Sequence, residues 1–173
     1  MKTLIFRRAL IPIALLTLLS IRCSYDNAGF DVTSIDLRNA MNVPMGSTGD
    51  ISNQWKQQKF SAAELALFSG LDTANLVGTI APIVSIQSSA YPNPFKYFTT
   101  IRAPFQTSNE VVAKYVIVNS FMSPVERNAI RLTSVNQLRI GSTIPGGRYR
   151  VYVIFTAQDN ENFFTCWGNI WKN

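Results

Sequence analysis

The stretches Val111–Val118 (VVAKYVIV) and Arg148–Thr156 (RYRVYVIFT) decide the fold of this 173-residue chain. Both are short, rich in β-branched and aromatic residues, and flanked by turn residues, a pattern typical of strands. The first stretch is apolar on both faces except at Lys114, as expected of a strand that is covered on both sides. The second alternates, because the odd-numbered positions from Tyr149 onward are apolar or aromatic and share one face. Both stretches therefore predict strands.

Shorter β-rich runs surround these two stretches, and turn residues separate each run from the next. They lie at residues 79–86, 99–103, 129–132, 137–140 and 163–171. Six or seven short strands within about a hundred residues, with no long helix between them, are typical of two sheets packed face to face. The sequence therefore predicts an all-β fold over residues 79–173, an antiparallel β-sandwich of about seven strands.

Residues 62–69 are predicted to form a short helix, which a connection up to position 78 follows. Ser61 and Glu64 have the spacing of a capping box, in which each residue's side chain bonds the other's backbone amide. Residues three apart are neighbours on a helix surface, so we expect Leu65 and Phe68 to share its apolar face.

The first 22 residues are predicted to form a secretory signal peptide. Lys2, Arg7 and Arg8 make a positive start, and residues 9–19 form an apolar segment, which is the order that such peptides have. An apolar helix of this length measures about 16 Å, roughly half the thickness of the hydrocarbon core of a bilayer. We therefore interpret residues 1–22 as an export signal and not as a transmembrane anchor.

Cys23 follows the apolar segment in the stretch Leu19–Cys23 (LSIRC). This stretch resembles a lipobox, in which lipoprotein signal peptidase cuts before a cysteine that carries the lipid. Arg22 departs from the small residue that is usual at its place. The alternative is a secreted protein in which Cys23 pairs with Cys166, although two cysteines make no disulfide framework. We predict that Cys23 is lipidated and anchors the chain in the outer membrane, and that Cys166 is a small core or interface residue.

Residues 23–60 are predicted to form a flexible tether. The segment is rich in Asn, Asp, Ser, Gly and Gln, and its few apolar residues follow no sustained period. A short strand that includes Val32, Ile35 and Leu37 is the one element that it allows. Ser24 and Asp26, just after the cysteine, give only a weak signal for surface export, so the periplasmic and cell-surface faces both stay open.

Charge and residue content exclude several classes of function. The signal peptide holds four of the 16 basic residues and none of the 10 acidic residues, so its removal lowers the net charge from +6 to +2. A nearly neutral chain lacks the clustered Lys and Arg that nucleic-acid binding uses. The chain has no histidine, which rules out Ser-His-Asp and Cys-His catalysis and zinc sites with imidazole ligands. We expect no nucleic-acid partner, no cofactor and no catalytic residues.

The acidic residues predict no metal site. Asp159–Asn162 (DNEN) offers oxygen atoms but lacks the spacing of a calcium-binding loop, so we interpret it as a hairpin connection. The other acids are scattered along the chain, and nothing in their spacing predicts a pair of carboxylates for glycoside hydrolysis.

Tyr91–Phe95 (YPNPF) opens a further pattern, which continues through a hydrophobic strand and the turn Pro145–Gly147 into RYRVYVIF. This order resembles the immunoglobulin-like C-terminal domains attached to cargo of the type IX secretion system. The similarity covers roughly half the chain, from Ala90 to the end. It implies an immunoglobulin-like β-sandwich in an extracytoplasmic protein of a Bacteroidota-type bacterium. The chain ends in CWGNIWKN and not in a lysine-rich strand, so the resemblance implies shared architecture and not a secretion signal.

Aromatic residues gather in two places and are the candidates for binding. Tyr97 and Phe98 lie beside the proline motif. Trp167 and Trp171 are four apart, so in an extended strand they project from the same face. Exposed, such rings dock a protein or stack on a sugar; buried, they complete the core. Both interpretations stay open for the two tryptophans.

The anchor, the tether and the missing catalytic chemistry together predict a non-enzymatic function. We expect a lipid-anchored envelope protein that acts as a binding or assembly module for another envelope protein. The alternative is a glycan-binding lipoprotein of a carbohydrate-uptake system, in which the tryptophans are stacking platforms.

Overall fold

The computed structural model describes residues 29–71, 88–103, 111–132, 137–157 and 160–173. Cys23, the predicted signal peptide and the predicted strand at 79–86 lie outside the described residues. Within this part the chain forms nine strands and one helix. They are β1 (Asp36–Arg38), β2 (Pro44–Ser47), α1 (Ala62–Ala66), β3 (Ser89–Tyr91), β4 (Thr99–Arg102), β5 (Val111–Val118), β6 (Pro124–Leu132), β7 (Gln137–Ile140), β8 (Gly147–Ala157) and β9 (Asn160–Lys172).

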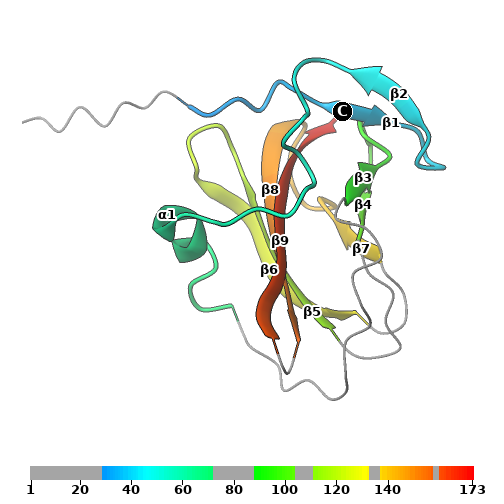
Figure 1. The fold of residues 1–173 in the computed structure, drawn as a ribbon. Helices are drawn as coiled ribbons and strands as arrows, with labels where there is room; N and C mark the ends of the chain where they lie inside the picture. The colour runs from blue at the N-terminus through cyan, green and yellow to red at the C-terminus, as the bar shows by residue number, and fades with distance from the viewer. Residues whose placement is uncertain (1–28, 72–87, 104–110, 133–136, 158–159) are drawn as a thin grey trace, which may run out of the picture.

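The strands form three antiparallel sheets (Figure 1). Four strands pair in the order β6-β5-β8-β9, three in the order β3-β4-β7, and β1 pairs with β2. Apolar side chains of the two larger sheets share one core, among them Ile101, Leu138, Val153 and Phe155. The prediction of an all-β, antiparallel chain is confirmed. The expected number of about seven strands is too low, because β1 and β2 form within the predicted tether and β3 forms between the predicted runs at 79–86 and 99–103.

β5 is buried along its whole length between β6 and β8. Its odd-numbered residues belong to the core that the two larger sheets share. Val116 and Val118 instead belong to a second apolar cluster, on the other side of the four-stranded sheet. The prediction that this strand is covered on both faces is therefore confirmed.

The second cluster, which we call the outer cluster, covers β5 and β8 from outside. Its buried members are Phe60, Phe68, Val116, Val118, Tyr152 and Ile154. The rings of Phe60 and Tyr152 meet edge to face with their centroids 5.4 Å apart. The segment around α1 therefore covers this face of the sheet, which accounts for the apolar outer side of β5.

α1 begins with the capping box that the sequence predicts. The Glu64 amide donates to the Ser61 hydroxyl, and the Ser61 amide donates to the Glu64 carboxylate over 2.7 Å. The helix ends at Ala66, however, and the chain continues in turns. Leu65 is exposed while Phe68 is buried, so the prediction that the two residues share an apolar face of the helix is wrong.

Residues 29–60 do not form the predicted tether. Trp55 is buried, and its backbone amide donates to the carbonyl of Trp167 in β9 over 2.7 Å. The amide of Gln58 donates to the carbonyl of Thr165 over 2.8 Å. The tether prediction is wrong here because a segment held by backbone hydrogen bonds needs no apolar period to pack.

The proline motif covers the remainder of the same edge of β9. The amide of Trp171 donates to Oδ1 of Asn93, and the amide of Phe95 donates to the carbonyl of Trp171, both over 2.9 Å. We call residues 54–58 and 93–95 the edge segments. Together they bond backbone groups of β9 from Thr165 onward on the side away from β8, so this part of the edge is covered.

Asn93 joins three distant parts of the chain. Its Nδ2 donates to the carbonyls of Asp36 at 3.1 Å and of Asn169 at 3.0 Å, while its Oδ1 accepts from Trp171. Its backbone also exchanges two hydrogen bonds with Arg38. The side chain is fully buried and its polar atoms are all paired, as a buried amide requires.

Trp55 lies directly on Gly168 of β9. A Cβ atom at position 168 would overlap the indole ring, so only glycine allows this approach. The buried ring belongs to the core shared by the two larger sheets. Trp55 therefore ties the first edge segment to that core as well as to the edge of β9.

We predict that Gly168→Ala lowers the free energy of unfolding by about 3 kcal/mol, because the added methyl group overpacks the core against Trp55. Urea denaturation measures the loss. Gly146→Ala is the control, since its Cβ would make only an ordinary contact, 3.6 Å from the Lys172 carbonyl oxygen. Equal stability of the two variants would contradict the packing of Trp55 on Gly168.

Candidate functional site

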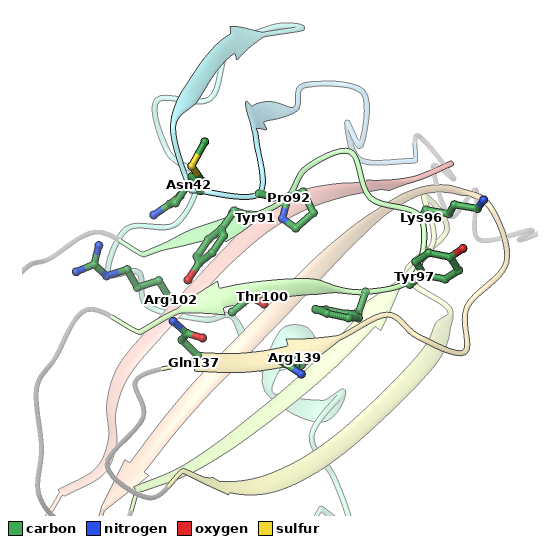
Figure 2. A pocket seen from close by; sticks show the side chains of 12 residues that line it. Asn42, Tyr91, Pro92, Lys96, Tyr97, Thr100, Arg102, Gln137 and Arg139 are labelled. Carbon is green, nitrogen blue, oxygen red and sulfur yellow. The ribbon is translucent and has the colours of Figure 1, made fainter.

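The outer face of the three-stranded sheet carries a groove of about 900 Å³, which we call the basic groove (Figure 2). β4 and β7 form its floor, and its rims are the β1–β2 connection and the loop before β4. Its lining residues are Ala40, Met41, Asn42, Tyr91, Pro92, Lys96, Tyr97, Phe98, Thr100, Arg102, Gln137 and Arg139. A volume of this size falls within the range of small-ligand pockets.

Strand alternation places the floor residues. Ile101 of β4 points into the core, so Thr100 and Arg102 on either side of it face outward. In register, Arg139 of β7 lies opposite Thr100, and Gln137 lies opposite Arg102. The floor is therefore two neighbouring rows of polar and basic side chains that the sheet holds in fixed order.

The groove concentrates positive charge. Lys96, Arg102 and Arg139 line it, and no carboxylate of the described residues does. Among the described residues none of these three cations forms an ion pair; the ion pair found there is that of Asp36 with Arg38 at 2.7 Å. Three cations that have no acidic partner within the described ranges therefore lie on one face. The groove is thus suited to an anionic group.

Aromatic rings accompany these cations. The Arg139 guanidinium lies 4.9 Å from the centre of the Phe98 ring, and the Lys96 ammonium lies 5.3 Å from that of Tyr97. Both rings are open to solvent, Tyr97 with 70% and Phe98 with 39% of its surface exposed. Cation–π contacts of this kind preorganise the charged groups next to faces on which a ligand can stack.

The structure separates the four aromatic residues that the sequence suggests for binding. Tyr97 and Phe98 line the basic groove, whereas Trp167 and Trp171 lie on β9 in the other sheet. In β9 the two tryptophans pair with Tyr152 and Arg148 of β8, so they share one face as expected. They do not take part in the groove.

Trp167 is held in place on both sides. It is half-buried against the outer cluster, and its Nε1 donates to Oε1 of Gln58. The Arg150 guanidinium lies 3.9 Å from its ring centre and 4.2 Å from that of Phe30. These contacts make Trp167 a structural residue that fastens residues 30 and 58 to the sheet.

Trp171 makes fewer contacts. It is half-buried, and its ring carries the exposed Arg148 guanidinium at 4.9 Å. Its backbone, and not its side chain, provides the bonds to the edge segments. The ring is therefore partly free to meet solvent.

Sequence patterns suggest Tyr97 and Phe98 but none of the other residues that line the groove, among them Arg102, Gln137 and Arg139. The alternation in TTIR (99–102) and QLRI (137–140) does predict that the polar positions face solvent. It does not predict that these two strands are neighbours, which brings the positions together. The sequence of each strand thus indicates which residues face solvent, but it does not indicate that the two strands pair.

Cys166 is a free thiol that is buried in the core, as the sequence predicts. Burial raises the pKa of its thiol well above the usual range, because the apolar surroundings disfavour the thiolate. A buried, protonated thiol is unreactive. Cys166 therefore supplies packing and no chemistry.

The described residues contain no group of three or more Cys, Asp or Glu that could hold a metal ion. No helix in the part of the chain that the structure describes is long and apolar enough to cross a membrane. Comparisons with protein-family models, with curated proteins and with solved structures give no match.

We predict that Trp167→Ala lowers the free energy of unfolding by about 2 kcal/mol, because the substitution removes the ring that Arg150, Gln58 and the outer cluster contact. Trp171→Ala is the matched control and should cost clearly less, since its ring contacts Arg148 at the surface. Thermal or urea unfolding measures both. A larger loss in Trp171→Ala would contradict the structural role of Trp167.

Proposed function

We propose that this protein is a lipid-anchored, non-enzymatic binding module of the bacterial outer membrane, and that the basic groove binds another envelope protein. One observation carries the proposal: exposed aromatic rings meet, in a single groove, cations that pair with no acid in the described part of the chain. The missing histidine argues in the same direction, because the commonest acid–base and nucleophilic constellations depend on it.

The composition of the groove favours a protein partner. Tyr, Arg and Met are enriched at protein interfaces, and binding energy concentrates on a few such residues. Tyr97 and Phe98 offer apolar surface that binding would remove from water, and Met41 lies on the opposite rim. Arg102 and Arg139 offer planar groups that bond carboxylates with two hydrogen bonds each.

The anchor is proposed from the N-terminal sequence. A positive start, a short apolar segment and Cys23 follow one another as in a lipoprotein signal. Burial of Cys166 in the core favours lipidation of Cys23 over a disulfide between the two, since the thiol of Cys166 is enclosed by other residues.

An immunoglobulin-like architecture is proposed on two grounds. The two larger sheets are antiparallel and share one core, and the sequence carries the YPNPF pattern of the secretion-system domains. Asn93 of that pattern bonds β1 and β9 at once, which gives the motif a physical role in closing such a domain.

We predict that Cys23→Ala abolishes incorporation of a fatty acid into the chain and releases it from the membrane fraction. Metabolic labelling with an alkyne-bearing palmitate measures the first effect, and fractionation measures the second. Cys166→Ala is the control that should keep the label. Label that persists in Cys23→Ala would contradict lipidation at this residue.

We predict that Tyr97→Ala with Phe98→Ala lowers the recovery of the partner at least about tenfold, the equivalent of some 1.4 kcal/mol, when the full chain is purified from detergent-solubilised envelopes. Leu65→Ala is the control, because Leu65 is also an exposed apolar residue and does not line the groove. An unchanged set of co-purified proteins in the double variant would contradict the proposal.

Binding of a glycan is the second candidate, and a specific observation favours it. The rings of Tyr91, Tyr97 and Phe98 line the same groove as the side-chain amides of Asn42 and Gln137, and sugar sites combine such stacking faces with amide donors and acceptors. The detergent-solubilised chain applied to a glycan array separates the two functions. Array signals that are lost in the Tyr97→Ala variant would indicate that the groove binds a glycan and not a protein.

A further inference from the structure

The described chain begins at the turn between β5 and β6. A Cβ atom on Gly29 would lie 2.7 Å from the carbonyl oxygen of Ser120, so the two backbones are in close contact. In Figure 1 the first described residues pass beside the hairpin of β5 and β6. The chain that leads back toward Cys23 therefore starts from this turn.

The connection between Gly29 and Cys23 is short. Six residue steps separate them in the sequence, and a fully extended chain spans at most about 3.6 Å per residue, or roughly 20 Å in all. The predicted tether over residues 23–60 would have allowed a much longer reach. With Cys23 lipidated, the turn lies within about 20 Å of the membrane surface.

Phe121 projects from this turn. Its side chain is 70% exposed, whereas the neighbouring Met122 packs on the outer cluster. The turn is well defined: Oδ1 of Asn119 accepts from the amides of Phe121 at 3.0 Å and of Ser123 at 3.1 Å. The turn therefore presents one large apolar side chain in a fixed position.

The turn suits a lipid surface in its charge as well. Its sequence Asn119–Pro124 (NSFMSP) contains no charged residue, so no ionised group would be moved out of water on contact. Val125, at the start of β6, is also exposed. Insertion of Phe at the boundary between headgroups and acyl chains is a known mode of interfacial attachment.

We infer that the β5–β6 turn rests on the membrane, with Phe121 inserted into its interface. The inference depends on the proposed lipid anchor. A single phenylalanine binds a bilayer weakly by itself, but an anchor at most six residue steps from the turn gives it a high effective concentration. The anchor holds the protein at the membrane, and the turn sets the orientation of the domain.

This orientation leaves the basic groove accessible. The groove lies on the three-stranded sheet, which Figure 1 shows on the side of the molecule away from the chain start and the β5–β6 hairpin. The four-stranded sheet lies between them. A partner can therefore reach the groove while the turn contacts lipid.

The test is a fluorescent label at position 121 in the full lipidated chain. Phe121→Cys is labelled with an environment-sensitive dye, and the chain is reconstituted into vesicles of phosphatidylethanolamine and phosphatidylglycerol that contain spin-labelled lipid. The thiol of Cys166 is buried, so the dye reacts with the introduced cysteine. Tyr97→Cys is the matched control, because both positions have 70% of their surface exposed.

We expect the spin-labelled lipid to quench the dye at position 121 at least about twofold more than the dye at position 97, with a blue-shifted emission at 121 only. Equal quenching at the two positions would overturn the inference. So would a dye at 121 that is protected from aqueous iodide but not quenched by lipid, since a protein would then cover the turn. Vesicle flotation separates the two proposals: a chain that floats without quenching at 121 refutes the orientation alone, and a chain that does not float refutes the anchor and the orientation with it.

Discussion

The outer edge of β9 is the place on which the rest of this structure depends. β9 is the last strand of its sheet, and without a cover its outward backbone groups would stay unpaired or recruit another chain. Residues 54–58 and 93–95 supply that cover with backbone and amide hydrogen bonds. Because these segments are far apart in sequence, the cover forms only when most of the chain is in place.

The same contacts build the basic groove. The β1–β2 connection, which makes one rim, is held by the hydrogen bonds between Arg38 and Asn93. Lys96 and Tyr97, on the other rim, directly follow Phe95, whose backbone is bonded to Trp171. The edge of β9 thus positions both rims on either side of the floor that β4 and β7 provide. Binding surface and structural edge are parts of one arrangement.

The edge contacts also shorten the part of the chain that connects the folded domain to the proposed lipid anchor. Once residues 29–60 belong to the folded domain, only a few residues separate Gly29 from Cys23. The proposed anchor then constrains orientation and not merely distance. Arg150 strengthens this, since it bonds the Asp31 carbonyl at 2.6 Å and stacks between Phe30 and Trp167.

Sequence reasoning succeeded where local patterns determine structure. β5, β8 and the capping box of α1 follow from alternation and spacing within a few residues. It failed for residues 29–60, because Gln54, Trp55 and Gln58 are held by partners in β9 more than a hundred positions away. The groove was missed for the same reason. The sequence of each strand indicates its solvent-facing residues, but the pairing of β4 with β7 joins segments that are far apart in the sequence.

Hydrogen–deuterium exchange on the full chain tests the central claim most directly. The amides of Trp55, Gln58 and Phe95 each donate to β9 and should exchange as slowly as the amides within β9 itself. Exposed amides near α1, such as that of Ala63, provide the fast reference. Rapid exchange at residues 54–58 beside a protected β9 would contradict the account, because the edge would then be open and the segment a tether after all.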